Sequence, residues 1–360
     1  MPLRAYMDNE EILSIDQNDE QWKELRTRLR RKEFKLTMPC CNQEGFLRTS
    51  HKGLKHFVHS KSSNLCDWKP ESSQHLRAKI EIIEACKENG WKAIPEFSEC
   101  NWRADVLAVR NKKRIAFEVQ WSRQTYEETK RRQEKYNQSN VRGCWFFRMP
   151  PIDLRNIDDS LMAQKELPAF QIREDENLDI VAQLHRSEFP LRALVDKLLK
   201  GKLKFCEEIR LNPKQELTIV FFKTSCWRCK KEQFCFTVES NLHTVCNQDY
   251  HLLASGWNSA NIDKNPQVYS AVKEIITSNK ERNIRVGTVK KRYSKTQYGK
   301  YLSHGCFYCD VIFDDYFLHD EKFEGLSNPQ SLRFKKIVNL ESKTSKHNHW
   351  CFSENGEFCQ

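Results

Sequence analysis

The stretch WRADVLAVRNKKRIAFEVQWS, residues 102–122, decides the fold of this chain. Two runs rich in β-branched and aromatic residues, 102–110 and 114–122, lie on either side of a short polar turn at 111–113. Such runs around a tight turn predict an antiparallel β-hairpin. The preceding run, 91–99, has the same character and predicts a third strand.

The segments around this hairpin predict two helices and one more strand. Residues 74–88 carry the helical apolar period, with Ser72 or Ser73 as N-cap and an Asn-Gly pair as stop signal. Residues 125–138 predict a second helix, and residues 141–149 predict a further strand. The order helix, three strands, helix, strand is typical of an α/β fold in which a mixed sheet is flanked by helices.

Two carboxylates lie on the predicted hairpin. Side chains alternate along a strand, so Glu118 and Gln120 share one face of their strand, while the other face is fully apolar. On the neighbouring strand, Asp105 shares its face with Arg103 and Leu107. The hairpin would therefore bring Asp105 close to Glu118.

A pair of carboxylates in an apolar setting favours a bound cation. The two groups repel each other unless a positive charge lies between them. Mg²⁺ prefers oxygen ligands of this kind, and it can polarise a scissile phosphate and activate water. The pair thus predicts hydrolysis of a phosphodiester with Mg²⁺ or Mn²⁺. The alternative is that Asp105 pairs with Arg103 or a nearby lysine and that Glu118 is a strand-end charge.

Several short motifs occur in a fixed order and resemble the competence protein CoiA family. A cysteine pair, KHFVH (55–59) and Cys66 come first, followed by ESSQHLRAK (71–79), PEFSECNWRADV (95–106), AFEVQWS (116–122), TKRRQEKY (129–136) and VRGCWFF (141–147). The resemblance covers about residues 37–150, under half of the chain. It implies a PD-(D/E)xK nuclease with a restriction-endonuclease-like core.

The resemblance assigns roles to the hairpin residues. It implies that Asp105 and Glu118 bind Mg²⁺ and that Gln120 takes the position of the lysine usual in that superfamily. Glutamine can orient a group only by hydrogen bonds, whereas lysine brings a positive charge. We therefore expect another cation to supply the charge, with Lys79 as candidate; the alternatives are weak catalysis or binding without cleavage.

Four further residues have a functional and an ordinary interpretation. Glu96 is either a third metal ligand or a surface acid. His75 either orients a phosphate or water from the helix or packs on its surface. Arg131 and Tyr136 either contact DNA phosphates or lie on a solvated helix face.

The charge of the chain agrees with a polyanionic partner. Its 360 residues carry a net charge of +11, which suggests nucleic acid, DNA above all, although a solvated basic surface gives the same number. The basic run KELRTRLRRKEFKL (23–36) is more typical of a solvated element than of a specific site.

Nothing in the sequence predicts a membrane segment. Hydrophobic residues make up 39% of the chain, and no apolar run reaches the roughly 18 residues of a membrane-spanning helix. The first residues are acidic and lack the apolar core of a signal peptide. We therefore expect a cytoplasmic protein; protein partners and oligomeric state are not predicted.

The 15 cysteines favour zinc over disulfides, because their number is odd and no export signal accompanies them. The pairs Cys226-x-x-Cys229 and Cys306-x-x-Cys309 each adjoin a strand-like run and predict one shared structural zinc site of four thiolates. The alternatives are reduced structural cysteines, or sites completed by Cys235, Cys246 or a histidine.

Two other groups of possible zinc ligands are weaker. The segment 37–70 offers Cys40, Cys41, His59 and Cys66, which either bind zinc or belong to a finger-like segment that folds by packing. At the other end we expect a solvated tail that contains His347, His349, Cys351 and Cys359.

These patterns together predict five parts. They are an N-terminal segment at 1–36, the finger-like segment at 37–70, a nuclease core at 71–150, a helical linker at 151–205 and a zinc-ribbon-like α+β domain at 206–360. The function that fits them is a metal-dependent nuclease acting on DNA, with a role in processing incoming or foreign DNA implied by the resemblance. The alternatives are a catalytically inactive, zinc-stabilised nucleic-acid-binding protein and a zinc-stabilised scaffold.

Overall fold

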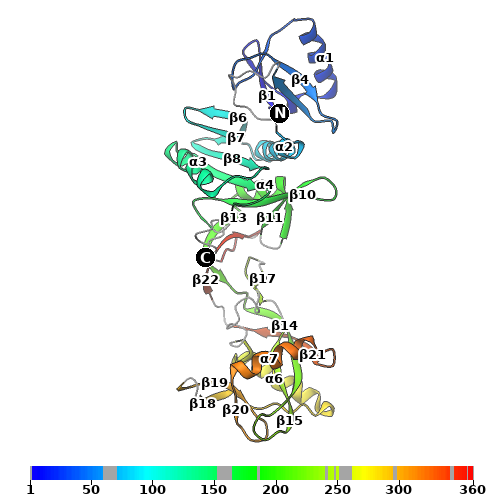
Figure 1. Ribbon diagram of the computed structural model, residues 1–360, viewed down its shortest axis with the longest axis vertical. Helices are drawn as coiled ribbons and strands as arrows, with labels where there is room; N and C mark the ends of the chain where they lie inside the picture. The colour runs from blue at the N-terminus through cyan, green and yellow to red at the C-terminus, as the bar shows by residue number, and fades with distance from the viewer. Residues whose placement is uncertain are drawn as a thin grey trace. The chain divides into compact units, whose positions relative to one another are not determined.

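The chain forms two compact units (Figure 1). Unit 1 comprises Met1–Glu207 and His347–Phe358, and unit 2 comprises Glu208–Lys346 and Cys359–Gln360. The computed structural model describes residues 2–59, 71–151, 164–184, 187–239, 242–246, 249–250, 262–294, 298–340, 344–354 and 356–359. None of the described helices has the length and apolar run that crossing a membrane requires.

A seven-stranded mixed sheet forms the centre of unit 1, in the order β12-β11-β10-β9-β8-β7-β6. Strands β8, β9 and β10 run parallel, and the other neighbours run antiparallel. The strands are β6 (Lys92–Glu99), β7 (Trp102–Arg110), β8 (Lys113–Gln120), β9 (Arg142–Phe147), β10 (Ala169–Glu174), β11 (Ile180–Leu184) and β12 (Ser187–Pro190). The mixed sheet and the hairpin β7-β8 confirm the sequence prediction.

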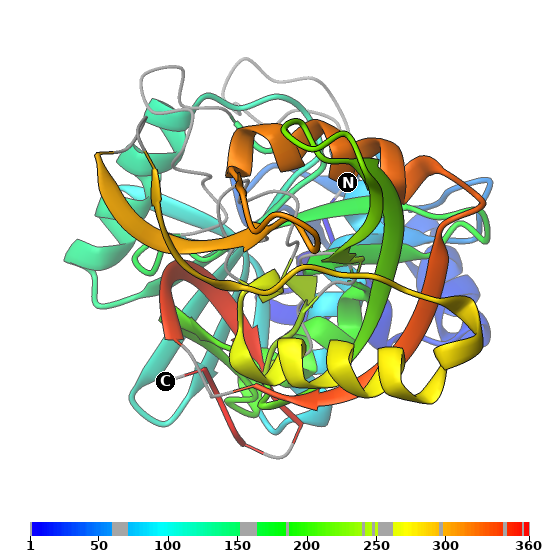
Figure 2. The ribbon, with the colours of Figure 1, turned by 90° about the horizontal axis from the view of Figure 1, so that it is seen from below.

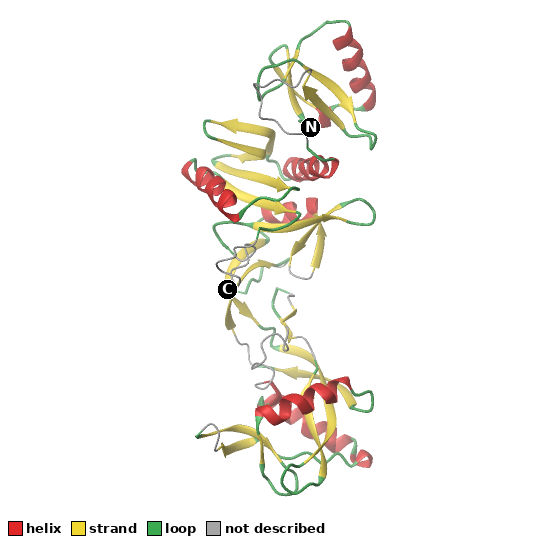
Figure 3. Cartoon of the chain, in the orientation of Figure 1, coloured by secondary structure: helices red, strands yellow, loops and turns green. Residues whose placement is uncertain are grey.

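Helices cover both faces of this sheet (Figures 1 and 3). Helix α2 (Ser73–Glu88) and helix α4 (Leu191–Leu199) pack on one face, in a cluster that includes Ile82 and Phe117. Helix α3 (Tyr126–Gln138) packs on the other face, where Tyr136 and Trp145 are buried. The predicted sheet flanked by helices is therefore present.

The starts of both long helices are fixed by side-chain caps. Ser72 accepts a hydrogen bond from the backbone N–H of His75, and Thr125 accepts one from Glu128, each at 3.1 Å. These bonds satisfy donors that a helix cannot satisfy internally. Helix α2 ends before Gly90, whose positive φ of 68° suits glycine.

The alternation of side chains in β7 shifts by one residue at Asp105. Ala104 and Leu107 both belong to the cluster with α3, whereas Val106 and Ala108 belong to the cluster with α2. A strict two-residue period would place Ala104 with Val106. The sequence predicted that Asp105 shares a face with Leu107, and this was wrong. Because of the shift, the Asp105 carboxylate lies on the opposite face and contacts α2.

A strained residue lies beside this shift. Strand β6 pairs Pro95 with Val106 and Phe97 with Ala104, and Glu96 between them has a φ of 47°. A residue with a side chain rarely adopts this left-handed backbone conformation, and such strain clusters at functional sites. The backbone around Glu96 and Asp105 is therefore strained within the sheet.

The segment 151–205 differs from the helical linker that we expected. Residues 169–190 supply strands β10, β11 and β12 of the same sheet, and only Leu191–Leu199 is helical within the described part of this segment. These strands have only six, five and four residues, so each is too short to show a clear apolar period in the sequence.

The N-terminal part of unit 1 has its own small core, in which Trp22, Leu36 and Phe57 are buried. It contains two small sheets, β2-β1-β3 and β4-β5, with helix α1 beside them. The elements are β1 (Arg4–Met7), β2 (Glu10–Leu13), η1 (Ser14–Asp16), α1 (Asp19–Arg30), β3 (Leu36–Thr37), β4 (Gly45–Thr49) and β5 (Lys55–His59).

The end of the chain returns to unit 1 instead of forming the solvated tail that we expected. Strand β22 (Thr344–Phe352) pairs with β13 (Leu203–Arg210). The ring of Trp350 lies 5.8 Å from that of Phe170 and 5.5 Å from that of Phe205. Within this tail His349, Cys351 and Cys359 are buried, because an apolar tryptophan anchors the strand.

Unit 2 is built around the three-stranded antiparallel sheet β15-β14-β21. Helix α6 packs against one face, with Val272 beside Phe221, and helix α7 covers the other face, with Leu318 beside Phe222 (Figure 2). The elements are β14 (Lys214–Ser225), β15 (Glu232–Val238), β16 (Leu242–His243), β17 (Asp249–Tyr250), α6 (Pro266–Ser278), η3 (Lys280–Arg282), β18 (Lys290–Ser294), β19 (Gly299–Gly305), β20 (Ile312–Phe313), α7 (Asp315–Ser327) and β21 (Leu332–Asn339).

The run after the last cysteine pair corrects one prediction. Residues 311–318 suggest a strand, but only Ile312–Phe313 is extended, and α7 begins at Asp315. Asp314 is the N-cap and accepts a hydrogen bond of 2.7 Å from the backbone N–H of Phe317. The cap outweighs the apolar run because it satisfies a helix donor at this position.

Removal of this cap should loosen the first turn of α7. We expect Asp314→Ala to cost about 1 kcal/mol locally and to speed amide hydrogen exchange in that turn about fivefold. Asp314→Asn, which retains a capping oxygen, should exchange nearly as slowly as the wild type. Equal exchange in the wild type and Asp314→Ala would contradict the capping role.

Candidate functional site

Three potential metal ligands converge where α2 meets β7. One ligand atom each from Glu71, His75 and Asp105 lies within 4.8 Å of the others. His75 Nε2 is 3.4 Å from Asp105 Oδ2, and the same oxygen accepts a hydrogen bond of 2.8 Å from the backbone N–H of Val119. Glu71 stands just before the helix, and its N-cap Ser72 sets the direction of the first turn. Two carboxylates and one imidazole are thus aimed at one point.

The second predicted ligand, Glu118, lies in a separate network toward α3. Its carboxylate is fully buried, with one oxygen bonded to the hydroxyl of Tyr136. The other oxygen is 2.6 Å from the Arg132 guanidinium and accepts a hydrogen bond of 3.3 Å from Gln120. Gln120 therefore touches the carboxylate itself, as its place on the same strand face predicted.

A buried lysine links α2 to the strained strand. Lys79 Nζ has no exposed surface, contacts Glu71 at 2.9 Å and also contacts Glu96. The same Glu96 oxygen accepts a hydrogen bond of 3.1 Å from the backbone N–H of Leu3. Arg4 donates to the carbonyl oxygen of Glu96 at 3.1 Å, so the N-terminal part of unit 1 holds this residue in place.

Burial and charge shift the pKa values of these groups in opposite directions. Burial raises the pKa of Glu118 to about 7, and the charge of Asp105 adds to the effect, although Arg132 opposes it. Burial acts the same way on Asp105, but the charges of His75 and Lys79 and the amide of Val119 together hold its pKa well below the usual range. Burial alone would lower the pKa of Lys79, yet its carboxylate neighbours raise it.

The cluster carries more negative than positive charge. The four carboxylates of Glu71, Glu96, Asp105 and Glu118 face two permanent cations, Lys79 and Arg132. Glu118 is paired with Arg132, so the excess lies with Glu71, Glu96 and Asp105, which outnumber Lys79. Among the described residues, His75 Nε2 and the second oxygen of Glu96 are buried without a hydrogen-bond partner. Both observations fit a divalent cation, since it supplies two positive charges and binds oxygen and nitrogen atoms through their lone pairs.

The structure also separates the remaining candidates. Arg131 is exposed and pairs with Glu128 at 3.4 Å, which agrees with a solvated helix face. Tyr136 is fully buried, so its hydroxyl is part of the Glu118 network and not a surface contact for DNA.

Sequence reasoning missed two members of the site, Glu71 and Arg132. Glu71 lies four residues before His75, one helical turn away, and this spacing could have marked it. Arg132 and Tyr136 are likewise four apart, so they face the same strand from one side of α3.

In unit 2 the two cysteine pairs form one cluster. Cys226 Sγ lies 3.7 Å from Cys309 Sγ, and Cys229 Sγ lies 3.7 Å from Cys306 Sγ. A tetrahedral zinc ion with bonds of about 2.3 Å separates its sulfur ligands by about 3.8 Å. The four thiols are therefore placed as a zinc site requires, and no fifth ligand position is needed.

The two halves of this cluster repeat one local geometry. In each half, a backbone N–H donates to the first cysteine sulfur, at 3.4 Å from Cys229 and 3.3 Å from Tyr308. Residues Lys230 and Asp310, each one position after its pair, have positive φ. Burial raises the pKa of Cys226, but backbone N–H groups outweigh it and lower the value to about 7, which favours the thiolate that binds metal.

The N-terminal cysteine group is less complete. Cys40 Sγ lies 3.2 Å from His59 Nε2 and 3.8 Å from Cys41 Sγ. The three ligand atoms lie within 4.8 Å of one another. Cys66, the fourth residue that we expected in this group, lies outside the described residues.

Comparison with known families gives one match. Residues 71–188 match the family model described as competence protein CoiA, nuclease-like domain. Residues 71–188 are therefore similar to this domain, and we refer to them as the CoiA nuclease-like domain. The match confirms the resemblance inferred from the sequence over residues 71–150, does not include residues 37–70, and extends through β10 and β11. No curated protein matches the chain.

The CoiA nuclease-like domain supports a nuclease-like role with nucleic acid as substrate or partner. Its match extends beyond the strand that ends at Phe147 and agrees with the seven-stranded sheet. All members of both carboxylate networks except the N-terminal residues lie within it.

The raised pKa of Glu118 predicts a pH-dependent stability. The folded pKa of about 7 exceeds the 4.5 of an unperturbed glutamate, so the stability from this group is full below 4.5 and is lost as the pH rises to about 7. Relative to Glu118→Gln, the unfolding free energy of the wild type should fall by on the order of 3 kcal/mol across this window. Denaturant unfolding in EDTA at several pH values measures it.

The control for this titration is Glu134→Gln, on the exposed side of α3. It removes a carboxylate without touching the buried network and should follow the wild type at every pH. A parallel pH profile for the wild type and Glu118→Gln would show that burial does not shift Glu118.

The cysteine cluster predicts one tightly held zinc ion. We expect Cys309→Ser to lower the zinc content of the purified chain by about one ion and to destabilise unit 2, because structural zinc contributes folding energy directly. Elemental analysis before and after dialysis measures the content. Cys235→Ser, a buried cysteine outside the cluster, should keep the ion. Equal zinc in both variants would rule out this site.

Proposed function

We propose that the CoiA nuclease-like domain hydrolyses phosphodiester bonds of DNA with a divalent cation, Mg²⁺ or Mn²⁺. The observation that supports this most is that Glu71, His75 and Asp105 aim one ligand atom each at a common point, in a segment that matches a nuclease-like family model. A role in processing incoming or foreign DNA, in the cytoplasm, is the biological setting we propose with it.

Asp105, Glu71 and His75 are the residues that would hold the ion. Their donor atoms fit the oxygen ligands of Mg²⁺ and the mixed oxygen and nitrogen ligands that Mn²⁺ tolerates. When bound, the ion would polarise the scissile phosphate and lower the pKa of a water molecule. The Val119 amide fixes the orientation of Asp105, and Lys79 fixes that of Glu71.

Glu118 is the proposed second carboxylate, and Arg132 supplies the charge that Gln120 lacks. Both Glu118 oxygens already have partners, so direct ligation would require Arg132 or Gln120 to release one of them. A released guanidinium would be free to contact a phosphate in two places, which suits arginine. Gln120 would then orient the attacking water by hydrogen bonds.

Unit 2 has a structural part in this proposal. Four thiolates around zinc leave no open position for chemistry, so the ion would hold the two cysteine turns together in a zinc-ribbon-like domain. The basic chain as a whole would attract DNA.

The alternative function is a nucleic-acid-binding protein that does not cleave. The observation in its favour is that both oxygens of Glu118 already contact partners, namely Arg132, Tyr136 and Gln120. In addition, the position of Gln120 holds no lysine. In that case the network would stabilise the fold, and DNA would bind without reaction.

A cleavage assay separates the two functions. Linear, single-stranded and branched DNA would be incubated with Mg²⁺ or Mn²⁺ and with wild type, Asp105→Asn or Glu71→Gln. We expect each variant to lose about a hundredfold or more in rate while still binding DNA, because each removes a charged ligand of the ion that would polarise the reacting phosphate. Calorimetry with Mn²⁺ should show weaker metal binding by both variants.

The matched control is again Glu134→Gln, which should cleave like the wild type. Arg132→Lys should keep more activity than Arg132→Gln if the charge matters. If wild type cleaves nothing in either metal and all variants bind DNA alike, the enzyme proposal is wrong and the binding function remains.

A further inference from the structure

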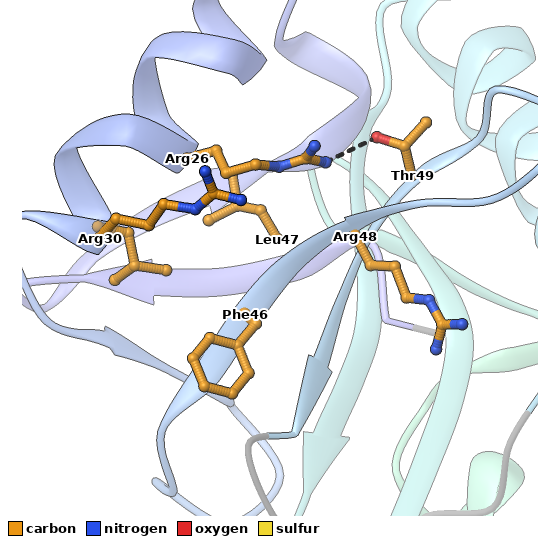
Figure 4. Close-up of a pocket in the computed structure, with 7 residues that line it drawn as sticks. Arg26, Arg30, Phe46, Leu47, Arg48 and Thr49 are labelled. Carbon is orange, nitrogen blue, oxygen red and sulfur yellow. Dashed lines mark hydrogen bonds between the residues drawn. The ribbon is translucent and has the colours of Figure 1, made fainter.

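A basic hollow lies on the N-terminal part of unit 1, between α1 and β4 (Figure 4). It has a volume of about 440 Å³ and is lined by Arg26, Arg30 and Arg48 together with Phe46, Leu47 and Thr49. Figure 4 shows Arg26 and Arg30 reaching from the helix toward the strand that carries Phe46 and Arg48. We call it the arginine–phenylalanine pocket.

The arginines of the pocket differ from their neighbours on the same segment. Arg28 and Arg31 pair with Glu33, at 3.2 Å and 3.8 Å. Among the described residues, Arg26, Arg30 and Arg48 form no ion pair. If the helix were merely solvated, its arginines would not be expected to differ between the side that faces the pocket and the other side. Three unneutralised guanidinium groups around one hollow favour an anionic ligand.

Arg26 is already oriented toward the hollow. Its Nη2 donates a hydrogen bond of 3.0 Å to Thr49 Oγ1, which ties the helix to the end of β4. Its Nε is buried and has no hydrogen-bond partner among the described residues. A buried charged donor without an acceptor is costly, which sets Arg26 apart from an arginine that is simply solvated.

Phe46 adds an aromatic surface beside these charges. Half of its side chain is exposed (50%), whereas the next residue, Leu47, is 9% exposed and packs in the small core. Because side chains alternate along a strand, Phe46 points outward, on the same side of the strand as Arg48. An exposed ring next to unpaired arginines is the combination that binds unpaired bases and their phosphates.

We propose that the arginine–phenylalanine pocket binds a single-stranded segment of nucleic acid, with phosphates at the three arginines and one base stacked on Phe46. The ligand class rests on the proposed function of the CoiA nuclease-like domain. A duplex fits less well, because its bases are stacked on one another and offer no free face to the ring. The basic run 23–36, which we expected to be merely solvated, would thus supply part of a binding site.

The test measures binding without cleavage. Fluorescence anisotropy of a labelled thymidine 15-mer with the full chain in EDTA should show about tenfold weaker binding by Phe46→Ala, since one stacked base is lost. Phe46→Trp should keep the affinity. Arg30→Gln and Arg48→Gln should each reduce the slope of log affinity against log salt by about 0.7. The matched control is Arg31→Gln, whose arginine already pairs with Glu33.

Three results would overturn the proposal. They are unchanged binding of the 15-mer by Phe46→Ala and the arginine variants, an equal loss of duplex binding in Phe46→Ala, and displacement of the 15-mer by polyglutamate at matched charge with the same dependence on Phe46. A loss of binding that follows Phe46 and the two arginines, but not Arg31, supports it.

The outcome is separable from that of the proposed function. If wild type cleaves DNA and Asp105→Asn does not, yet the pocket variants bind like wild type, the pocket proposal fails alone. If wild type cleaves nothing but the pocket variants lose binding of the 15-mer, the nuclease proposal fails and the pocket remains.

Discussion

The one-residue shift in β7 at Asp105 is the constraint on which the site depends. It directs the Asp105 carboxylate toward His75 on α2, whereas Glu118 on the next strand keeps its contacts with Arg132 and Tyr136 on α3. Each acid thus has cationic or hydrogen-bonding partners from a different helix. Neither helix alone would complete the arrangement, which explains why the order helix, three strands, helix is needed.

The buried charges also tie the N-terminal part of unit 1 to the CoiA nuclease-like domain. Lys79 is fully buried, and a buried cation is stable only when it is paired. One of its partners is Glu96, whose strained backbone is held by Leu3 and Arg4. The first strand of the chain is therefore part of the support for the carboxylates, although it lies outside the family match.

Much of the sheet could be predicted from the sequence, because its signals are local. The serine and threonine caps, the Asn-Gly stop and the alternation in β8 all act within a few residues. The shift at Asp105 could not be predicted, because a period of two describes a regular strand. The same limit applies to the contacts of Glu118. The place of Gln120 follows from the alternation of its own strand, whereas the contact with Arg132 joins residues 14 positions apart and depends on how α3 packs.

Two other differences have similar causes. The run 311–318 looks like a strand, although it contains the aspartate that caps α7. The apolar period of β10 to β12 is weak, so the sequence does not predict their place in the sheet. The two cysteine pairs lie together, as their motif predicts, even across the helix-bearing segment between them, because a site of four thiolates has strict geometry. Chemistry with strict geometry was thus more predictable than packing.

The return of β22 to unit 1 has a consequence for how the chain matures. Trp350 packs against Phe170 and Phe205. The ribosome adds both phenylalanines to the chain long before it adds this tryptophan. All of Glu208–Lys346 must be translated before this tryptophan emerges. Until then the apolar surface around Phe170 and Phe205 is uncovered, so the final assembly of unit 1 is post-translational.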